Sequence, residues 1–139
     1  MIQELTVDDL KKLVGQPWMT LTYPIEQELV RRFVEAVGDG NPRWKGDKAE
    51  ASPALLLTIG FERVISMLLN LPEAVLHGST ELECFEPVKV GDVLTVSARV
   101  DTLRERKPLT FVNLELEQHN QKGVLVARCK QLAILRGKA

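Results

Sequence analysis

Polar and apolar residues follow two helical patterns, separated by a run of β-formers, over the first third of the chain. Thr6-Val7-Asp8-Asp9 places an acidic residue three positions after a threonine, which predicts a capping box and a short helix to about Val14. Residues 18–23 carry β-formers and predict a first strand. Between Ile25 and Val37 the apolar residues recur at one-face helical spacing, which predicts an amphipathic helix that Gly38 ends.

The middle of the chain changes twice in character. Residues 39–52 combine glycine, proline and charge without an apolar period, which predicts a loop long enough to suggest a functional role. Residues 54–70 are apolar nearly all round and predict one long helix enclosed by protein. Glu62 and Arg63 interrupt this apolar run, so it does not fit the roughly 20 apolar residues of a membrane span.

Four long segments with period-2 stretches make up the second half of the chain and predict strands. They cover residues 76–85, 93–104, 109–119 and 124–135. Because their connectors are short and turn-like, we expect consecutive strands to form an antiparallel meander. This order predicts an α+β fold in which an antiparallel sheet of about five strands wraps one long helix. Its length of 139 residues predicts one domain, residues 1–139.

Composition narrows the class of protein. With 18 basic and 19 acidic side chains, the chain has no charge excess that would favour nucleic acid or an anionic membrane as a partner. Cys84 and Cys129 lie far apart and outside metal-ligand spacing, so we interpret both as reduced core or strand residues. The first twelve residues lack the apolar segment of a secretion signal, which predicts a cytoplasmic location.

Three short motifs occur in order along the chain. They are Gly38-Asp39-Gly40-Asn41-Pro42, Phe85-Glu86-Pro87-Val88-Lys89-Val90-Gly91-Asp92 and Asn120-Gln121-Lys122-Gly123. Together they resemble the G-D-x-N-P, F-x-P-V-x-x-G-D and N-Q-x-G segments of MaoC-like (R)-specific enoyl-thioester hydratases and 3-hydroxyacyl-thioester dehydratases. The resemblance implies a hot-dog fold, a dimer whose sheets join edge to edge, and a tunnel for an acyl-CoA or acyl-carrier-protein thioester between the subunits. It implies no metal and no redox cofactor.

The resemblance also points to a catalytic pair, of which this chain has one member. In the family an aspartate and a histidine share the attacking water, and Asp39 matches the aspartate. The histidine position is occupied by Trp44. An indole N–H donates a hydrogen bond but cannot take up a proton, so Trp44 cannot act as a general base. Asp39 has a simpler alternative role, that of capping its turn. We interpret His77 and His119 as surface or strand-end histidines.

The start of the helix over residues 54–70 is a second candidate region. In the resembled family this segment supplies a backbone N–H that polarises the thioester carbonyl. Pro53 has no N–H, so Ala54 is the candidate donor, and Pro53 is equally compatible with a plain first-turn proline. Together with the loop after Gly38, this region gives the predicted substrate-binding residues, which are Asn41, Pro42, Trp44, Ser52 and Ala54.

A kept G-D-x-N-P segment without its histidine resembles the substrate-shaping subunits of heteromeric dehydratases, whose sister chain carries the intact pair. This implies a homodimer or a heterodimer with a second hot-dog chain. One alternative is a non-catalytic module that binds acyl thioesters. Another is an acyl-CoA thioesterase that uses Glu62, although we interpret Glu62 more simply as a helix-end or interface residue linked to the neighbourhood of Arg63.

Overall fold

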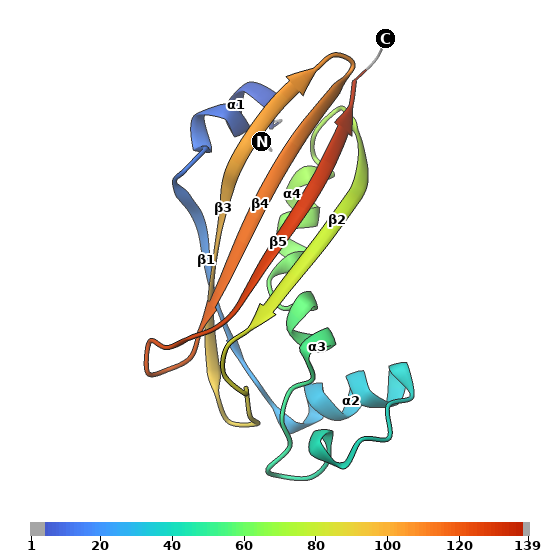
Figure 1. The fold of residues 1–139 in the computed structure, drawn as a ribbon, viewed down its shortest axis with the longest axis vertical. Coiled ribbons are helices and arrows are strands. Elements are labelled where there is room, and N and C mark those ends of the chain that lie inside the picture. The colour runs from blue at the N-terminus through green and yellow to red at the C-terminus, as the bar shows by residue number, and fades with distance from the viewer. Residues whose placement is uncertain (1–4, 138–139) are drawn as a thin grey trace.

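The computed structural model describes residues 5–137, in which helices and a five-stranded sheet enclose one hydrophobic core (Figure 1). The elements follow in the order α1 (Val7–Leu13), β1 (Pro17–Pro24), α2 (Gln27–Val37), the 3₁₀ turn η1 (Pro42–Trp44), α3 (Pro53–Thr58), α4 (Phe61–Leu68), β2 (Ala74–Cys84), β3 (Val93–Arg106), β4 (Leu109–His119) and β5 (Leu125–Arg136). The predicted α+β class with an antiparallel sheet of five strands is confirmed.

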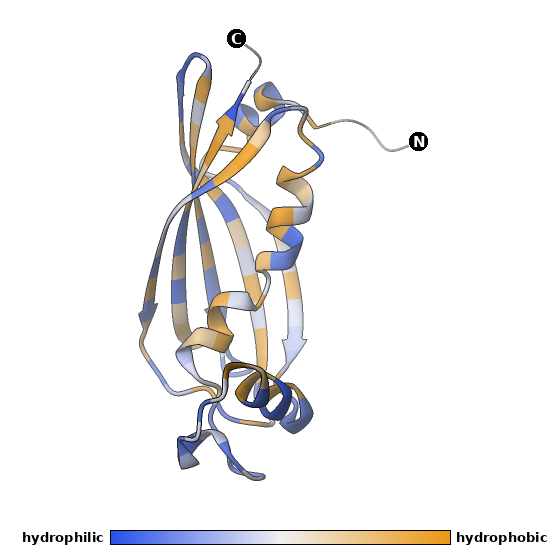
Figure 2. Ribbon diagram, turned by 90° about the vertical axis from the view of Figure 1, so that its right-hand side faces the viewer, coloured by the Kyte–Doolittle hydropathy of each residue, from blue (hydrophilic) through white to orange (hydrophobic). Residues whose placement is uncertain are grey.

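The core lies between the concave face of the sheet and the helices α3 and α4. Figure 2 shows these two helices end to end along one face of the curved sheet. Alternate residues of the central strands point to this face and are buried, as the period-2 pattern predicts. They include Leu94, Val96, Ala98 and Val100 of β3 and Val112, Leu114 and Leu116 of β4. Burying each Val or Leu side chain contributes about 1.5–3 kcal/mol, so these rows stabilise the packing of the sheet against the helices.

The prediction of a single helix over residues 54–70 is wrong, because the helix is interrupted at Gly60 and divides into α3 and α4. Gly60 has φ +85°, and a Cβ there would lie 2.8 Å from Cγ1 of Val96. The break frees carbonyl groups, and the buried Gln118 side chain donates to Leu56 O at 2.8 Å and to Ile59 O at 3.4 Å. Among residues 5–137, no helix is long and apolar enough to cross a lipid bilayer.

The predicted meander holds for three of its four strands. The sheet order is β1-β3-β4-β5-β2, so β3, β4 and β5 are consecutive neighbours, whereas β2 pairs with β5 at the far edge. Residues 85–92 therefore cross from one edge of the sheet toward the other instead of closing a hairpin. Ile25 holds this crossing in place, since its N–H donates to Asp92 O at 2.8 Å and its carbonyl accepts from Gly91 N–H at 2.9 Å.

The predicted N-terminal capping box is present in α1. Thr6 Oγ1 accepts a hydrogen bond from Asp9 N–H at 3.2 Å, and Asp9 Oδ2 accepts from Thr6 N–H at 2.9 Å. The hydrogen bonds from Thr6 lower the pKa of the Asp9 carboxyl. Beyond α1, Gly15 N–H donates to Val100 O at 2.8 Å, which fixes the helix beside β3.

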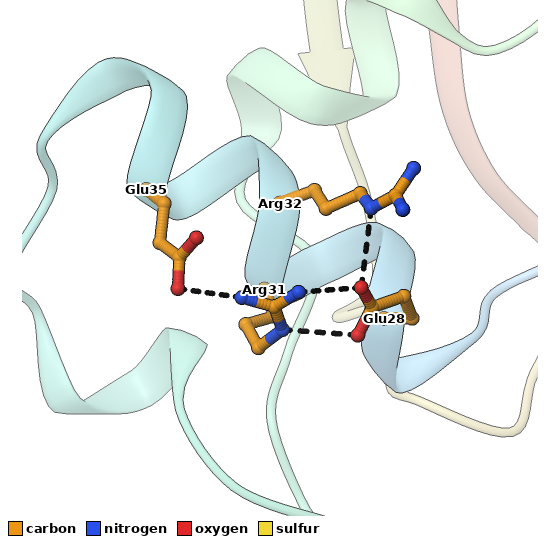
Figure 3. Close-up of polar contacts among 4 residues, drawn as sticks. All are labelled: Glu28, Arg31, Arg32 and Glu35. Atoms are coloured by element: carbon orange, nitrogen blue, oxygen red, sulfur yellow. Dashed lines mark hydrogen bonds and ion pairs between the residues drawn. The ribbon is translucent and has the colours of Figure 1, made fainter.

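Helix α2 is amphipathic, as predicted, and ends at Gly38 in the left-handed conformation. Val30 and Val34 are buried, while a cluster of charged residues covers the opposite side (Figure 3). There Arg31 donates to both Glu28 and Glu35, and Arg32 donates to Glu28. The contacts with Arg31 first, and then with Arg32, lower the pKa of Glu28 to about 2. These exposed pairs contribute little to stability individually, but they support a helix that carries the candidate site at its C-terminal end.

Candidate active site

Asp39 and Asn41 build a tight turn directly after α2. The Asn41 N–H donates to Asp39 Oδ1 at 3.0 Å, and the Arg43 N–H donates to Asn41 Oδ1 at 3.0 Å. Asn41 is thereby the N-cap of η1, in which Pro42 occupies the first turn. The turn-capping role considered for Asp39 is thus present, since one of its oxygens holds backbone.

The other oxygen of Asp39 is bound by Trp44. The indole Nε1–H donates to Asp39 Oδ2 at 2.9 Å. Asp39 is exposed, and Trp44 is half-buried against the hydrophobic core. The structure therefore brings together the residue that matches the family aspartate and the residue at the histidine position. Their contact is a hydrogen bond from a group that cannot accept a proton.

Arg43 covers the outer side of Trp44. Its guanidinium carbon lies 5.2 Å from the centre of the indole ring, within cation–π range. Arg43 Nε also donates to Glu50 Oε2 at 2.7 Å, and the Glu50 N–H donates to Arg43 O at 2.8 Å. These contacts fix the orientation of the indole from the solvent side.

A cavity of about 230 Å³ lies next to Trp44. It is bounded by the loop after η1, the start of α3 and the segment that follows β2. Its lining is mostly apolar and consists of Arg43, Trp44, Glu50, Ala51, Pro53, Leu56, Cys84, Phe85, Glu86, Pro87 and Val88. A mostly apolar cavity with a few polar groups at its border is typical of a small-molecule site. Figure 1 shows α2, α3 and the end of β2 gathered at this end of the sheet.

Two backbone contacts hold the loop against the segment after β2. Ala51 N–H donates to Val88 O at 2.7 Å, and Val90 N–H donates to Ala49 O at 2.9 Å. Phe85 is placed from the other side, where the Arg128 guanidinium lies 5.6 Å from its ring centre. Two segments that are more than thirty residues apart in the sequence thus form one wall of the cavity.

The predicted residues at the start of α3 lie beside this cavity. Ser52 is buried and caps the helix, and its Oγ accepts from Leu55 N–H at 3.4 Å. Pro53 is in the first turn and lines the cavity, whereas Ala54 is exposed. Among the described residues the Ala54 N–H makes no hydrogen bond. Because α3 has only six residues, its dipole is smaller than that of the single long helix predicted from the sequence.

The two histidines lie on strands of the sheet and have partners there. His77 is exposed in β2, where its Nε2 is 2.7 Å from Gln131 Oε1 and 2.7 Å from Thr80 Oγ1. His119 is the last residue of β4, and its Nε2 is 4.0 Å from Glu117 Oε2. Neither is among the residues that line the cavity.

Glu62 has a different partner from the one expected. Its Oε1 accepts a hydrogen bond from the Tyr23 hydroxyl at 2.7 Å, and the predicted link to the neighbourhood of Arg63 is replaced by this contact with β1. Burial, together with the hydrogen bond to Glu62, raises the pKa of Tyr23 to about 12. Glu62 is not among the residues that line the cavity beside Trp44.

The comparisons with known proteins agree with the motifs. Residues 12–129 match the family model described as FAS1-like, dehydratase domain region. The chain belongs to this MaoC-like hot-dog dehydratase family. It is 26% identical over 129 residues to the UPF0336 protein SCO4636 of Streptomyces coelicolor, an alignment that covers 81% of this chain and 85% of that protein.

Two solved structures show the fold of the family. The MaoC-like dehydratase of Rhodospirillum rubrum superposes with a TM-score of 0.77 at 21% identity, covering 97% of this chain and 99% of that one. A chain of the Mycobacterium tuberculosis HadBC complex, a 3R-hydroxyacyl-ACP dehydratase, superposes with a TM-score of 0.72 at 16% identity, covering 84% and 94%. The predicted hot-dog fold is therefore confirmed.

Within this hot-dog domain the structure groups only some of the predicted site residues around the cavity. Trp44 lines it, while Asp39 reaches it through the indole and Asn41 and Pro42 shape the turn that carries the indole. Ser52 and Ala54 flank it at α3. Their roles in binding or catalysis stay predictions.

Other lining residues were missed from the sequence, although the motif over residues 85–92 supplies several of them. Cys84 was interpreted only as a strand residue, and it lies exposed at the end of β2, at the cavity wall. Cys129 is buried in β5, and both cysteines are free. Among residues 5–137, no group of three or more His, Cys, Asp and Glu side chains is arranged to hold a metal ion.

Proposed function

We propose that this chain is one subunit of an acyl-thioester hydratase or dehydratase, and that a second hot-dog chain carries the catalytic Asp/His pair. The reaction is the reversible addition of water to an enoyl thioester. The water oxygen bonds to the β carbon, a proton is delivered to the α carbon, and the product is a 3-hydroxyacyl thioester. An acid–base group must manage each proton, and donors must hold the enolate-like oxygen.

The contact between Asp39 and Trp44 is the observation that carries this proposal. The turn and the aspartate of the G-D-x-N-P motif are present, but an indole occupies the position of the histidine that would exchange protons with water. A positioned acid–base group contributes on the order of 10²–10⁴-fold to such a reaction, so a site made from this chain alone is weakened by that much.

The cavity beside Trp44 is the proposed place for the thioester. Trp44, Leu56 and Phe85 supply apolar surface for an acyl chain or for the pantetheine arm. Asn41 and Pro42 hold the turn that positions Trp44, and Ser52 fixes the start of α3. The Ala54 N–H, which makes no hydrogen bond among the described residues, is the donor proposed for the thioester carbonyl.

The proposed partner binds along β2. This strand is an edge of the sheet with eleven residues, most of them exposed, and a long uncovered edge favours pairing with another strand. Its last residue, Cys84, lines the cavity, so a chain paired with β2 would lie next to the candidate site. The HadBC complex is an assembly of family members with different chains, which supports a heterodimer and leaves a homodimer as the alternative.

A non-catalytic acyl-thioester-binding module is the second candidate, and the same contact favours it. A chain that only binds a thioester needs the cavity and not the proton transfer, so loss of the histidine has no cost for it. A thioesterase that uses Glu62 has no such support, because Tyr23 binds that carboxylate away from the cavity.

Hydration assays with purified chain test the proposal. Short and bulky enoyl-CoA substrates are offered to the chain alone, and to the chain co-expressed with a hot-dog protein that has an intact G-D-x-N-P-x-H segment. We expect no activity from the isolated chain, and an activity of the complex that exceeds that of the partner alone. Activity of the isolated chain that Asp39→Asn abolishes would contradict the proposal, and an inactive complex that still binds the thioester would favour the binding module.

A further inference from the structure

We infer that a basic groove beside the candidate site binds the phosphate-bearing arm of the thioester carrier, which is either CoA or the phosphopantetheine group of a carrier protein. The inference rests on the proposed function only in assuming that the neighbouring cavity takes the thioester. It assigns to this chain the task of holding the carrier, which is independent of the missing histidine.

The groove has a volume of about 590 Å³ and opens next to η1. Four cationic and two anionic side chains line it, whereas the whole chain has a net charge of −1. Its lining consists of Pro42, Arg43, Lys45, Asp47, Lys48, Glu50, Lys89 and Val90. A concave surface with an excess of one charge concentrates ligands of the opposite charge, so this groove favours an anion.

The backbone brings these cations together from two distant segments. Glu50 and Lys89 form an antiparallel bridge, and the Val90 N–H donates to Ala49 O at 2.9 Å. Lys89 from the segment after β2 is thereby fixed opposite the loop that carries Lys45 and Lys48. The cluster is consequently part of the fold and does not arise from one flexible stretch of sequence.

Three of the four cationic side chains in the groove are not paired with a carboxylate of the described residues. Among the described residues, Lys45, Lys48 and Lys89 form no salt bridge, in contrast to Arg31 and Arg32 on α2, which pair with glutamates. A lysine ammonium is a compact charge with three donors and binds phosphate oxygens well. Arg43 is paired with Glu50, but an ion pair at this exposure is weak enough to exchange for a phosphate.

The groove and the apolar cavity share Arg43 and Glu50 in their linings. A ligand that lies across this shared border would place an uncharged end beside Trp44 and Leu56 and a charged end beside the three lysines. Acyl pantetheine with a terminal phosphate has this distribution of polarity. A free acid with its charge at the acyl end does not fit it.

Binding measurements by calorimetry on the full chain test the inference. The probes are CoA, pantetheine without phosphate, and a carrier protein in its phosphopantetheine form and its unmodified form. The variant is Lys45→Gln/Lys48→Gln/Lys89→Gln. The matched control, Lys12→Gln/Lys107→Gln/Lys130→Gln, removes the same charge from exposed lysines elsewhere.

We expect the affinity for the phosphorylated probe to fall about tenfold or more in the groove variant, to stay within about twofold in the control, and to weaken with added salt. If the three lysines are needed for binding of CoA, or only for binding of the modified carrier protein, the inference is supported and the source of the phosphate is identified. Equal binding by wild type and groove variant, equal binding of pantetheine and CoA, or no binding of either phosphorylated probe would overturn it. Because no turnover is measured, lysine-dependent CoA binding by a chain whose complex with the partner hydrates no enoyl thioester would refute only the catalytic proposal.

Discussion

Trp44 donates its indole N–H to Oδ2 of Asp39 at 2.9 Å, and the second oxygen of Asp39 accepts the Asn41 N–H at 3.0 Å. Both oxygens of the family aspartate are therefore occupied by donors within its own loop. The donor that occupies Oδ2 is an indole, which cannot accept a proton. Since this loop has no proton acceptor at the histidine position, we propose that a partner chain supplies it.

Substitution at Gly60 tests the break between α3 and α4. Gly60→Ala must adopt φ +85° and place a Cβ 2.8 Å from Val96 Cγ1, so we expect a loss of about 2–5 kcal/mol in the free energy of unfolding. Gly40→Ala is the matched control, because a Cβ there meets nothing within 4 Å and its φ is not positive. Urea unfolding of both variants measures the difference. Equal stability of the two variants would show that α3 and α4 do not need the break.

Alkaline titration tests the contact between Tyr23 and Glu62. Tyr23 is the only tyrosine, so tyrosinate absorbance reports on it alone, and we expect a midpoint near a pKa of about 12 in the folded protein. Because folding raises this pKa from 10.0, the associated stability is present below pH 10 and is lost as the pH rises toward 12. In Glu62→Gln the midpoint should fall only partly, since burial is the larger cause. A midpoint near 10 in folded wild type would refute the contact.

Alkylation tests whether the cavity beside Trp44 holds the thioester. Iodoacetamide should modify Cys84, which lines the cavity, and spare Cys129, which is 3% exposed. Burial raises the pKa of the Cys84 thiol, so its reaction at neutral pH should be slower than that of the unfolded chain. Saturating enoyl-CoA should protect Cys84, and mass spectrometry of wild type and Cys84→Ser locates the label. The same rate with and without ligand would exclude this cavity as the thioester site.

Local patterns predicted those elements that local interactions determine. The capping box of Thr6 and Asp9, the amphipathic helix ended by Gly38, and the late strands all depend on residues close in the sequence. The break at Gly60 depends on Val96 and Gln118, which lie on strands more than thirty residues away. The local apolar pattern contains no sign of these contacts, and it therefore predicted one continuous helix. The place of β2 beside β5 was hidden for a similar reason, since residues 85–92 have the composition of a turn but cross the sheet.

The sequence predicted several residues of the candidate site but not the contacts between them. The motifs singled out Asp39 and Trp44, but nothing in the sequence shows that the indole bonds the carboxylate. The lining contributed by Cys84 and Phe85 comes from a segment that only the crossing after β2 brings near the loop. Likewise Lys89 joins Lys45 and Lys48 through a bridge between distant backbones.

Restoring a histidine tests the central claim most directly. Hydration of a short enoyl-CoA is measured for Trp44→His, for Trp44→Phe, which keeps an aromatic wall without a base, and for Trp44→His/Asp39→Asn. We expect Trp44→His to exceed wild type and Trp44→Phe by on the order of 10²-fold or more, and the added Asp39→Asn change to abolish the gain. If Trp44→His binds the thioester but hydrates it no faster than Trp44→Phe does, loss of the histidine is not what separates this chain from an active hydratase.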